Sequence, residues 1–223
     1  MADGTLFIGT RRYSSWSLRG WLAVQLAGLD VAVETIPLAG GATAEVKAKT
    51  PAGFVPYLEH DGARVWDSLA IAEYCAEIAP ALWPADRVHR ALLRSASAEM
   101  HSGFSALRRS FPCIMGSIAP LSARDANAND EASADIARIC ALWAELLAAS
   151  AGPFLHGAEM GVADAMFAPV ATRMRTWSLE VPAAAQGYVA AVHDHPLMKR
   201  WFAEAEAEPA DWRREHYEVR LRA

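Results

Sequence analysis

Cysteine is scarce in this sequence of 223 residues. The three cysteines, Cys75, Cys113 and Cys140, are odd in number and far apart, and none belongs to a CxxC pair or to a Cys/His cluster with zinc spacing. A disulfide framework and a structural zinc are therefore not expected, and we predict no bound metal. We expect all three to be small hydrophobic side chains in buried or half-buried positions.

An excess of basic charge and long apolar runs are missing too. Lys and Arg number 21 against 26 Asp and Glu, and the net charge of −5 argues against nucleic acid or an anionic membrane as a partner. No uncharged apolar run reaches the length of about 18 residues that a membrane span needs. The start Met1–Thr5 lacks the basic and apolar parts of a signal peptide, so we expect a cytoplasmic protein.

What is present is a globular composition, with 53% hydrophobic and 21% charged residues. That is enough to bury the core of one large or two small domains. In the first 80 residues, short β-branched runs alternate with helical periodicity in the order β-α-β-α-β-β-α, which predicts an α/β unit with a mixed sheet. The predicted strands are 5–8, 31–36, 55–60 and 64–66, and the predicted helices are 15–26, 44–49 and 68–78.

Turn residues divide the chain. Gly28 is expected to end the first helix, and Asp61-Gly62 predicts a tight hairpin between the last two strands. Pro80 and Pro84 bracket a linker, after which only helical patterns recur. We therefore predict an α/β domain over residues 1–80, a linker over 81–86 and an all-helical domain over 87–223. The helices expected in that last domain are 87–111, 130–150, 162–177, 183–194 and 197–208.

Several local motifs, in this order, resemble those of the soluble glutathione transferase superfamily. Tyr13–Arg19 (YSSWSLR) resembles the Ser-Ser-Cys-x-x-Arg stretch of the zeta-type members, which use serine. Phe54–Leu58 (FVPYL) resembles the segment that holds a cis proline, and Asp67–Tyr74 (DSLAIAEY) resembles the glutathione motif. Gly161–Asp164 is similar to the capping box of the helical domain. The resemblance spans nearly the whole chain and implies a thioredoxin-like domain followed by a helical bundle.

The resemblance implies a glutathione transferase that activates the thiol of its co-substrate, glutathione, for attack on a small electrophile, and it implies a homodimer. A thiol attacks as its thiolate, and a free thiol with a pKa of about 8.5 is mostly protonated at neutral pH. A hydroxyl at a helix N-terminus can stabilise that anion. Ser14 matches the first serine of the motif and is our predicted thiol partner. Ser15, Ser17 and Tyr13 are the alternatives, and we expect one of the serines to cap the helix.

The resemblance also assigns residues to the rest of glutathione. Ser68, at the start of a predicted helix, suits the γ-glutamyl carboxylate, and Asp67 suits the amine of the same fragment. Val55, just before a cis Pro56, offers its backbone N–H and C=O to the cysteinyl part. Lys47 is the candidate for the glycyl carboxylate. The structural alternatives are a plain helix cap at Asp67-Ser68 and a solvated lysine.

The second substrate is expected between the first turn and the first long helix. The candidates for this electrophile pocket are Tyr13, Trp16, His101, Phe104 and Arg108. Phe104 belongs to an apolar stripe at helical spacing that also predicts core. His101 and Arg108 lie beside that stripe and suit a carbonyl or an acidic substrate, with solvation or helix salt bridges as the alternative. Trp16 stands where the zeta-type motif has Cys, so no nearby thiol supports glutaredoxin-like exchange.

Two other functions are compatible with the same motifs. A glutathione-dependent cis-trans isomerase of the maleylacetoacetate isomerase kind adds the thiol and releases it again, although Trp16 in place of Cys weakens that inference. A non-catalytic ligand-binding protein can share the fold. Ser14 and the Asp67-Ser68 pair favour catalysis, because a pure scaffold needs neither.

Overall fold

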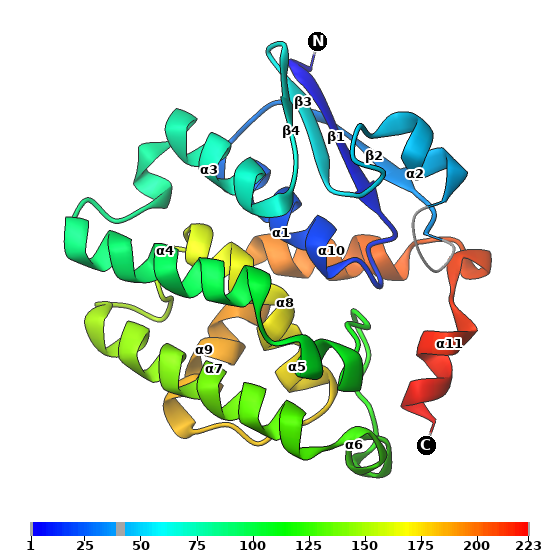
Figure 1. Ribbon diagram of the computed structural model, residues 1–223, viewed down its shortest axis with the longest axis vertical. Coiled ribbons are helices and arrows are strands. Elements are labelled where there is room, and N and C mark those ends of the chain that lie inside the picture. Colours follow the sequence, from blue (N-terminus) through cyan, green and yellow to red (C-terminus); the bar gives the residue numbers. More distant parts are fainter. Residues whose placement is uncertain (1, 39–42, 223) are drawn as a thin grey trace.

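The computed structural model describes residues 2–38 and 43–222 and places a sheet-containing domain beside a bundle of helices (Figure 1). The first domain has the predicted order of strands and helices, and it is thioredoxin-like. Its elements are β1 (Gly4–Gly9), α1 (Ser15–Ala27), β2 (Ala32–Ile36), α2 (Ala44–Lys49), β3 (Tyr57–His60), β4 (Ala63–Val65) and α3 (Ser68–Ile78).

The sheet is mixed, with the strand order β2-β1-β3-β4. β1 is parallel to β2 and antiparallel to β3, and β3 is antiparallel to β4. Leu6 and Ile8 of β1 are fully buried while Phe7 between them is half-buried, the alternation expected of a strand with one well-covered face. α1 and α3 pack against each other and against the strands.

The turns follow from residues that tolerate a positive φ. Gly28 ends α1 in the left-handed conformation, with a φ of 69°. Asp61 and Gly62 have φ values of 49° and 78°, as a two-residue hairpin turn between β3 and β4 requires. Both turns confirm the sequence prediction.

The helical domain surrounds α8, which is buried along almost its entire length and contacts α1, α4 and α9. One hydrophobic core therefore runs from the sheet domain through α1 into the bundle. The second domain consists of η1 (Pro80–Leu82), α4 (Arg87–Ser102), α5 (Ser105–Ser110), α6 (Leu121–Asn127), α7 (Asp130–Ala149), α8 (Val162–Thr176), α9 (Ala183–Asp194), α10 (Pro196–Glu206), η2 (Ala210–Trp212), α11 (Glu215–Glu218) and η3 (Val219–Leu221).

The single helix predicted over 87–111 is wrong. α4 ends at Ser102, and Phe104 adopts the left-handed conformation with a φ of 55° before α5 begins. Gly103 is a poor helix former. The Arg108 guanidinium also donates to the carbonyl oxygens of Met100, at 2.9 Å, and His101, at 3.3 Å, at the end of α4. A side chain thus supplies hydrogen bonds that a continuing helix would have made.

The N-terminus of α8 is organised by a buried carboxylate. Asp164 is fully buried and accepts hydrogen bonds from the backbone N–H groups of Leu155 at 2.8 Å, His156 at 3.2 Å and Gly161 at 3.0 Å. Gly161 occupies the N-cap but has no side chain to return a bond, so only half of a reciprocal capping box is formed.

The remaining general features concern thiols and apolar helices. Cys75, Cys113 and Cys140 are free and buried, as predicted. Burial raises the pKa of the Cys75 thiol to about 12. Among the helices within 2–38 and 43–222, none combines the length and apolar character of a membrane span.

Candidate functional site

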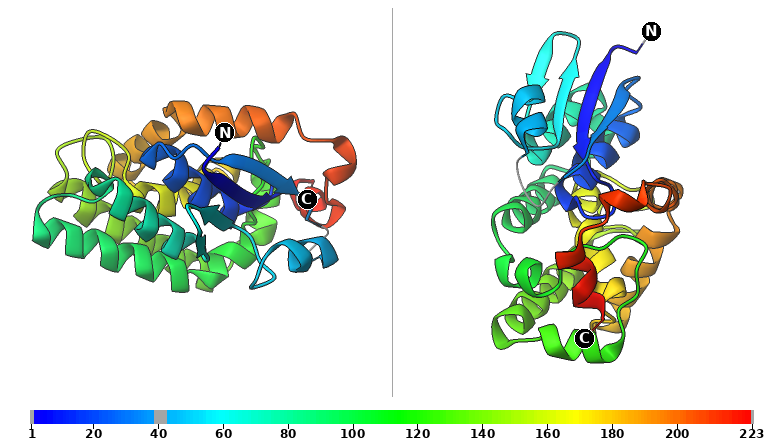
Figure 2. Two further views of the ribbon diagram at one scale, coloured as in Figure 1. Left: turned by 90° about the horizontal axis from the view of Figure 1, so that it is seen from above. Right: turned by 90° about the vertical axis from the view of Figure 1, so that its right-hand side faces the viewer.

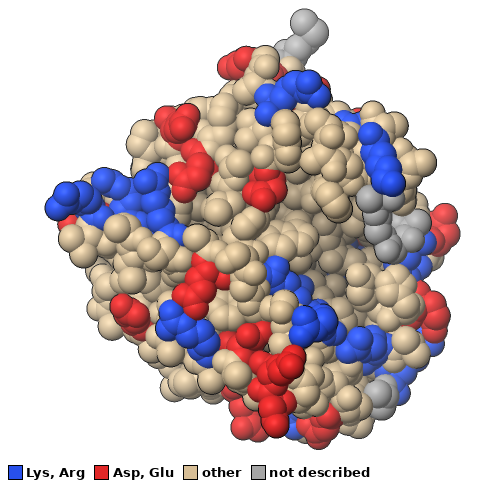
Figure 3. Space-filling view, in the orientation of Figure 1, with Lys and Arg blue, Asp and Glu red and all other residues tan. Residues whose placement is uncertain are grey.

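Two cavities of about 380 Å³ each adjoin near the N-terminus of α1 and share Trp16, Phe54 and Val55 in their walls. Asp67 and Ser68 line the first cavity. The second is lined by the hydroxyl-bearing and basic residues Tyr13, Ser14, Ser15, Arg108, Arg173 and Arg214. Figure 3 shows a hollow in this face of the molecule, with Lys and Arg side chains along its lower side.

The first cavity contains a buried hydroxyl at the start of α3. Ser68 is only 1% exposed, and its Oγ has no hydrogen-bond partner among the described residues. Asp67 caps α3, since its Oδ1 accepts from the N–H groups of Leu69 at 2.9 Å and Ala70 at 3.4 Å. The Asp67 cap is therefore present, as the structural alternative predicted, and the Ser68 hydroxyl remains available to an added ligand.

His101 lies in the first cavity rather than beside the serines of the second. Its Nε2 is 2.9 Å from Oδ2 of Asp67, and its ring packs edge-on against Trp16 with centroids 5.2 Å apart. Its Nδ1 is buried without a partner within the described part of the chain. The structure thus places His101 in the cavity that holds Asp67 and Ser68, beside Trp16 of the predicted electrophile pocket.

The backbone before β3 is open to pairing. The Val55–Pro56 peptide bond is cis, as the resemblance implied. The N–H and C=O of Val55 make no hydrogen bond to the rest of the described chain, and Val55 faces both cavities. Lys47 of α2 is exposed and lines neither cavity. A Cβ placed on Gly53 would touch the Lys47 side chain at 3.4 Å, so the lysine stem passes beside the second cavity, where Gly53 is part of the wall.

Three hydroxyl groups face the second cavity, from Tyr13, Ser14 and Ser15, while Ser17 is fully buried behind them. Ser14 is the N-cap of α1, and its Oγ accepts from the N–H of Ser17 at 3.2 Å. The Oγ atoms of Ser14 and Ser17 are 2.7 Å apart, and Gly9 N–H donates to Ser17 Oγ at 2.9 Å. Because hydroxyl groups rotate, donation from Ser17 to Ser14 would free the Ser14 proton for a ligand.

The other two hydroxyl groups differ in availability. The Ser15 side chain makes no hydrogen bond within the described residues. Tyr13 donates its phenol proton to Glu218, and its oxygen accepts from the N–H of Arg214 at 3.0 Å. Burial raises the pKa of Tyr13, and the Glu218 carboxylate raises that pKa further. The Tyr13 hydroxyl is therefore committed to the C-terminal segment.

The second cavity is strongly basic. Arg108, Arg173 and Arg214 line it, and in the chain as described none of them forms an ion pair with a carboxylate. Arg173 is buried and donates to the carbonyl oxygens of Phe111 and Pro169 instead. Unneutralised positive charge around a cavity favours an anionic occupant. Sequence reasoning missed Arg173 and Arg214. An arginine within the otherwise apolar stretch 162–177 was the available signal for the former.

Trp16 separates the two cavities. The guanidinium groups of Arg19 and Arg108 lie over its ring, at 4.4 Å and 4.9 Å from the ring centroid. Arg19 is 1% exposed, and burial together with the charges of Arg173 and Arg108 lowers its pKa. Phe104 lines neither cavity and packs in the core, which is the alternative that its apolar stripe suggested.

Comparison with known proteins agrees with this arrangement of a thioredoxin-like domain, a helical domain and a cleft between them. Residues 13–78 match the family "Glutathione S-transferase, N-terminal domain", and residues 126–204 match "Glutathione S-transferase, C-terminal domain". A maleylacetoacetate isomerase from Rhizobium meliloti (strain 1021) is 31% identical over 196 residues, which cover 82% of this chain and 87% of the relative. The molecule is an enzyme that uses glutathione. It belongs to the glutathione S-transferase family.

Solved structures share the fold. A glutathione transferase homologue from Burkholderia GL BGR1, with bound glutathione, has a TM-score of 0.69 at 23% identity over 92% of this chain and 100% of that one. A maleylacetoacetate isomerase from Anaeromyxobacter dehalogenans 2CP-1 has a TM-score of 0.66 at 23% identity over 96% of this chain and 98% of that one.

Proposed function

We propose that this enzyme is a glutathione transferase in which the tripeptide occupies the first cavity and presents its sulfur to the second. The observation that carries the proposal is the buried Ser68 hydroxyl, which has no partner among the described residues and lies at the N-terminus of α3. A buried polar group without a partner is costly unless a ligand satisfies it.

Each polar part of glutathione has a matching group. The γ-glutamyl carboxylate suits the Ser68 hydroxyl and the positive end of α3, and its amine suits the Asp67 carboxylate beside it. The cysteinyl backbone suits the unpaired N–H and C=O of Val55, which cis Pro56 holds at the cavity wall. Lys47, whose stem passes beside Gly53, is our candidate for the glycyl carboxylate.

The sulfur would then lie near the N-terminus of α1. There Ser14, backed by Ser17, can donate a hydrogen bond to the thiolate, and the free N–H groups of the first turn add positive potential. Buried Arg19, whose Nη1 donates to the carbonyl of Ser15 at 3.2 Å, fixes the backbone behind that turn. Lowering the thiol pKa by two units requires about 2.7 kcal/mol, which such groups can supply together.

Replacement of Ser68 tests this proposal. With an aryl halide as the electrophile, the enzyme should form a glutathione conjugate. Ser68→Ala should raise the KM for glutathione at least about tenfold and change kcat little, because this contact is remote from sulfur and stabilises ground and transition states alike. Ser102→Ala, on the exposed face of α4, is the control. A collapse of kcat at unchanged KM would contradict the placement of the γ-glutamyl group.

The second candidate function is glutathione-dependent isomerisation, favoured by the three cavity arginines without carboxylate partners and by the isomerase name of the 31% identical relative. In that reaction the thiolate adds to one carbon of a double bond, the new single bond rotates, and elimination restores the double bond and releases glutathione. A cis-alkene diacid is the matching substrate. Its conversion to the trans form without consumption of glutathione would select this function over conjugation.

A further inference from the structure

The last residues of the chain contact Arg12 and Tyr13, in the loop between β1 and α1. Residues 209–222, here called the C-terminal strap, include η2, α11 and η3 and run along the side of the helical domain (Figures 1 and 2). None of these residues is fully buried, and Tyr217 and Leu221 are partly buried against the core. The strap therefore depends on polar contacts for much of its attachment.

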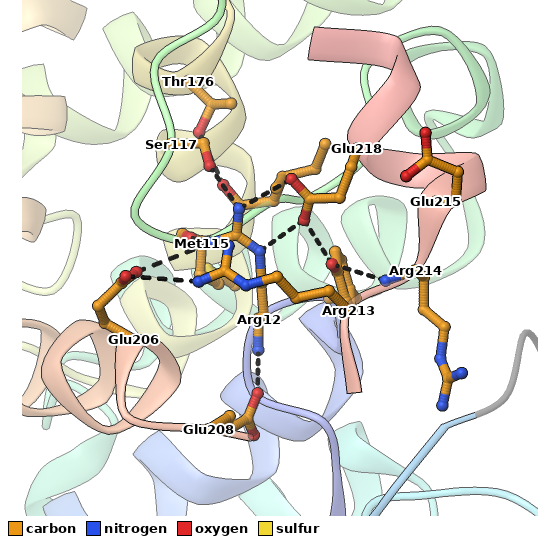
Figure 4. Close-up of polar contacts among 12 residues, drawn as sticks. Arg12, Met115, Ser117, Thr176, Glu206, Glu208, Arg213, Arg214, Glu215 and Glu218 are labelled. Carbon is orange, nitrogen blue, oxygen red and sulfur yellow. Dashed lines mark hydrogen bonds and ion pairs between the residues drawn. The ribbon is translucent and has the colours of Figure 1, made fainter. Parts of the chain in front are cut away.

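The main contact is a carboxylate shared by two neighbouring side chains. Glu218 accepts hydrogen bonds from Nε of Arg12 at 2.7 Å and from Nη2 of Arg12 at 3.1 Å (Figure 4). It also accepts a hydrogen bond from the Tyr13 hydroxyl. Arg12 is itself buried and fixed by donation to the Met115 carbonyl and the Ser117 hydroxyl. A two-point arginine–carboxylate pair of this kind fixes both distance and direction.

Other contacts place the strap in the wall of the second cavity. The N–H of Arg214 donates to the Tyr13 oxygen at 3.0 Å, and the rings of Tyr13 and Tyr217 stack with centroids 5.0 Å apart. The Arg214 side chain donates to the Leu38 carbonyl. As a result Arg214 and Tyr217 face the same cavity as Ser14, although 200 residues separate them along the chain.

We propose that the C-terminal strap is the specificity wall of the electrophile pocket: Arg214 and Tyr217 contact the second substrate, and Glu218 is the positioning residue that holds them there through Arg12 and Tyr13. This inference rests on the proposed glutathione chemistry. Asp67 and Ser68, which we propose to bind the γ-glutamyl part of glutathione, line the first cavity only, and no strap residue lines that cavity. The strap therefore acts on the electrophile and not on the tripeptide.

The chemistry of the wall indicates the kind of electrophile. Tyr217 lines the second cavity with an aromatic ring that stacks on Tyr13, and Arg214 offers a guanidinium group with no carboxylate partner among residues 2–38 and 43–222. A planar conjugated electrophile that carries a carboxylate matches both. Partial burial raises the pKa of Glu218, but the hydrogen bonds from Arg12 and Tyr13 outweigh it and lower the pKa overall. Glu218 is thus ionised at neutral pH.

The test compares Glu218→Ala with Glu215→Ala. Glu215 lies on the same turn of α11 but is exposed and pairs with Arg222, so it is the matched control. Glu218→Ala should raise the KM for a carboxylate-bearing electrophile about tenfold, the effect of one charge-assisted hydrogen bond, and leave the KM for glutathione unchanged. Backbone amide exchange in 209–222 should accelerate in Glu218→Ala and not in Glu215→Ala.

A second pair of variants tests substrate contact directly. Arg214→Ala should weaken binding of the carboxylate-bearing electrophile more than that of its neutral amide, and Arg213→Ala, whose side chain does not line the cavity, should change neither. Tyr13→Phe keeps the ring and removes the hydroxyl, so it tests the attachment by the same readouts if Glu218→Ala fails to fold.

The outcomes separate the possible failures. Unchanged amide exchange in Glu218→Ala would overturn the attachment, and faster exchange with an unchanged electrophile KM would overturn the specificity role. A wild-type protein without any glutathione-dependent turnover would refute the proposed function instead, and amide exchange would still decide whether Glu218 holds the strap.

Discussion

Ser14 is both a helix cap and a residue of the cavity wall. It caps α1 through its Oγ and stands in the wall of the cavity where the sulfur is proposed to lie. The sequence predicted that one of the serines caps this helix. The structure gives the cap to Ser14, while Ser17 ties the Ser14 hydroxyl to the N–H of Gly9. Loss of the Ser14 hydroxyl must therefore affect both stability and chemistry.

Ser14→Ala should raise the pKa of enzyme-bound glutathione by at least about one unit, which corresponds to about 1.4 kcal/mol. Activity should fall most near pH 7 and recover at higher pH, where the thiol ionises without help. The lost cap should also cost about 1 kcal/mol of unfolding free energy. Titration of the thiolate absorbance of bound glutathione measures the first effect, and denaturant unfolding measures the second.

Ser15→Ala is the matched control, because Ser15 lies in the same cavity wall and has no side-chain hydrogen bond in the described chain. Its thiol titration should match that of the wild type. If the pKa of bound glutathione rose in Ser15→Ala and not in Ser14→Ala, Ser15 would be the residue that stabilises the thiolate.

At the scale of single elements, Asp164 is the residue on which α8 depends. Asp164→Ala should lower the unfolding free energy by about 2–5 kcal/mol, because three buried backbone N–H groups lose their acceptor together. Asp164→Asn, which keeps one acceptor oxygen, should fall between Ala and the wild type. Urea unfolding measures both, and an unchanged midpoint in Asp164→Ala would contradict this account.

The elements also show where sequence reasoning is sufficient. The helix bounds Ala44–Lys49, Ser68–Ile78 and Ala183–Asp194 were predicted because caps, glycines and prolines mark their ends locally. The break at Gly103 was missed because the apolar stripe continues through it. The break is stabilised by Arg108, which reaches back to the carbonyl groups of α4 from the next helix.

Some residues of the candidate site could also be predicted from local sequence, and others could not. Ser14, Val55, Asp67 and Ser68 stand in short motifs, so the sequence could nominate them. Arg214 lies at the cavity through contacts of the C-terminal strap with residues near the opposite end of the chain, from Arg214 to Tyr13 and from Glu218 to Arg12, and no local pattern encodes a pairing between such distant positions. The position of His101 was not predictable for a similar reason, since its Nε2 pairs with Asp67 of the other domain and so places the ring in the first cavity.

For the whole molecule, we propose the two-fold homodimer that the family resemblance implied, with the sheet domain of one chain against the helical domain of the other. Phe54 and Val88, one from each domain, are 69% and 72% exposed and are the two most exposed large apolar side chains of the described residues. Val88→Glu should shift the protein toward monomer, because a charge in an apolar interface is costly.

Sedimentation at micromolar concentration measures this assembly. The wild type should sediment with about twice the chain mass of 24.1 kDa. Leu121→Glu, which changes an exposed leucine on α6, is the control and should remain dimeric. A wild-type species with the mass of a single chain would contradict the proposal.

α1 belongs to both halves of the molecule, since it packs under the sheet and also against α8, where Arg19 Nε donates to the Met166 carbonyl at 2.8 Å. The chain changes from a mixed sheet with helices to helices alone near Pro80, but the packed core continues across that point. A chimera that takes residues 1–80 from a relative would contain an α1 whose side chains pack against the α8 of that relative and not against the α8 of this chain. Recombination between members of this family at the linker therefore requires the Met166 face of α8 to be transplanted together with the sheet.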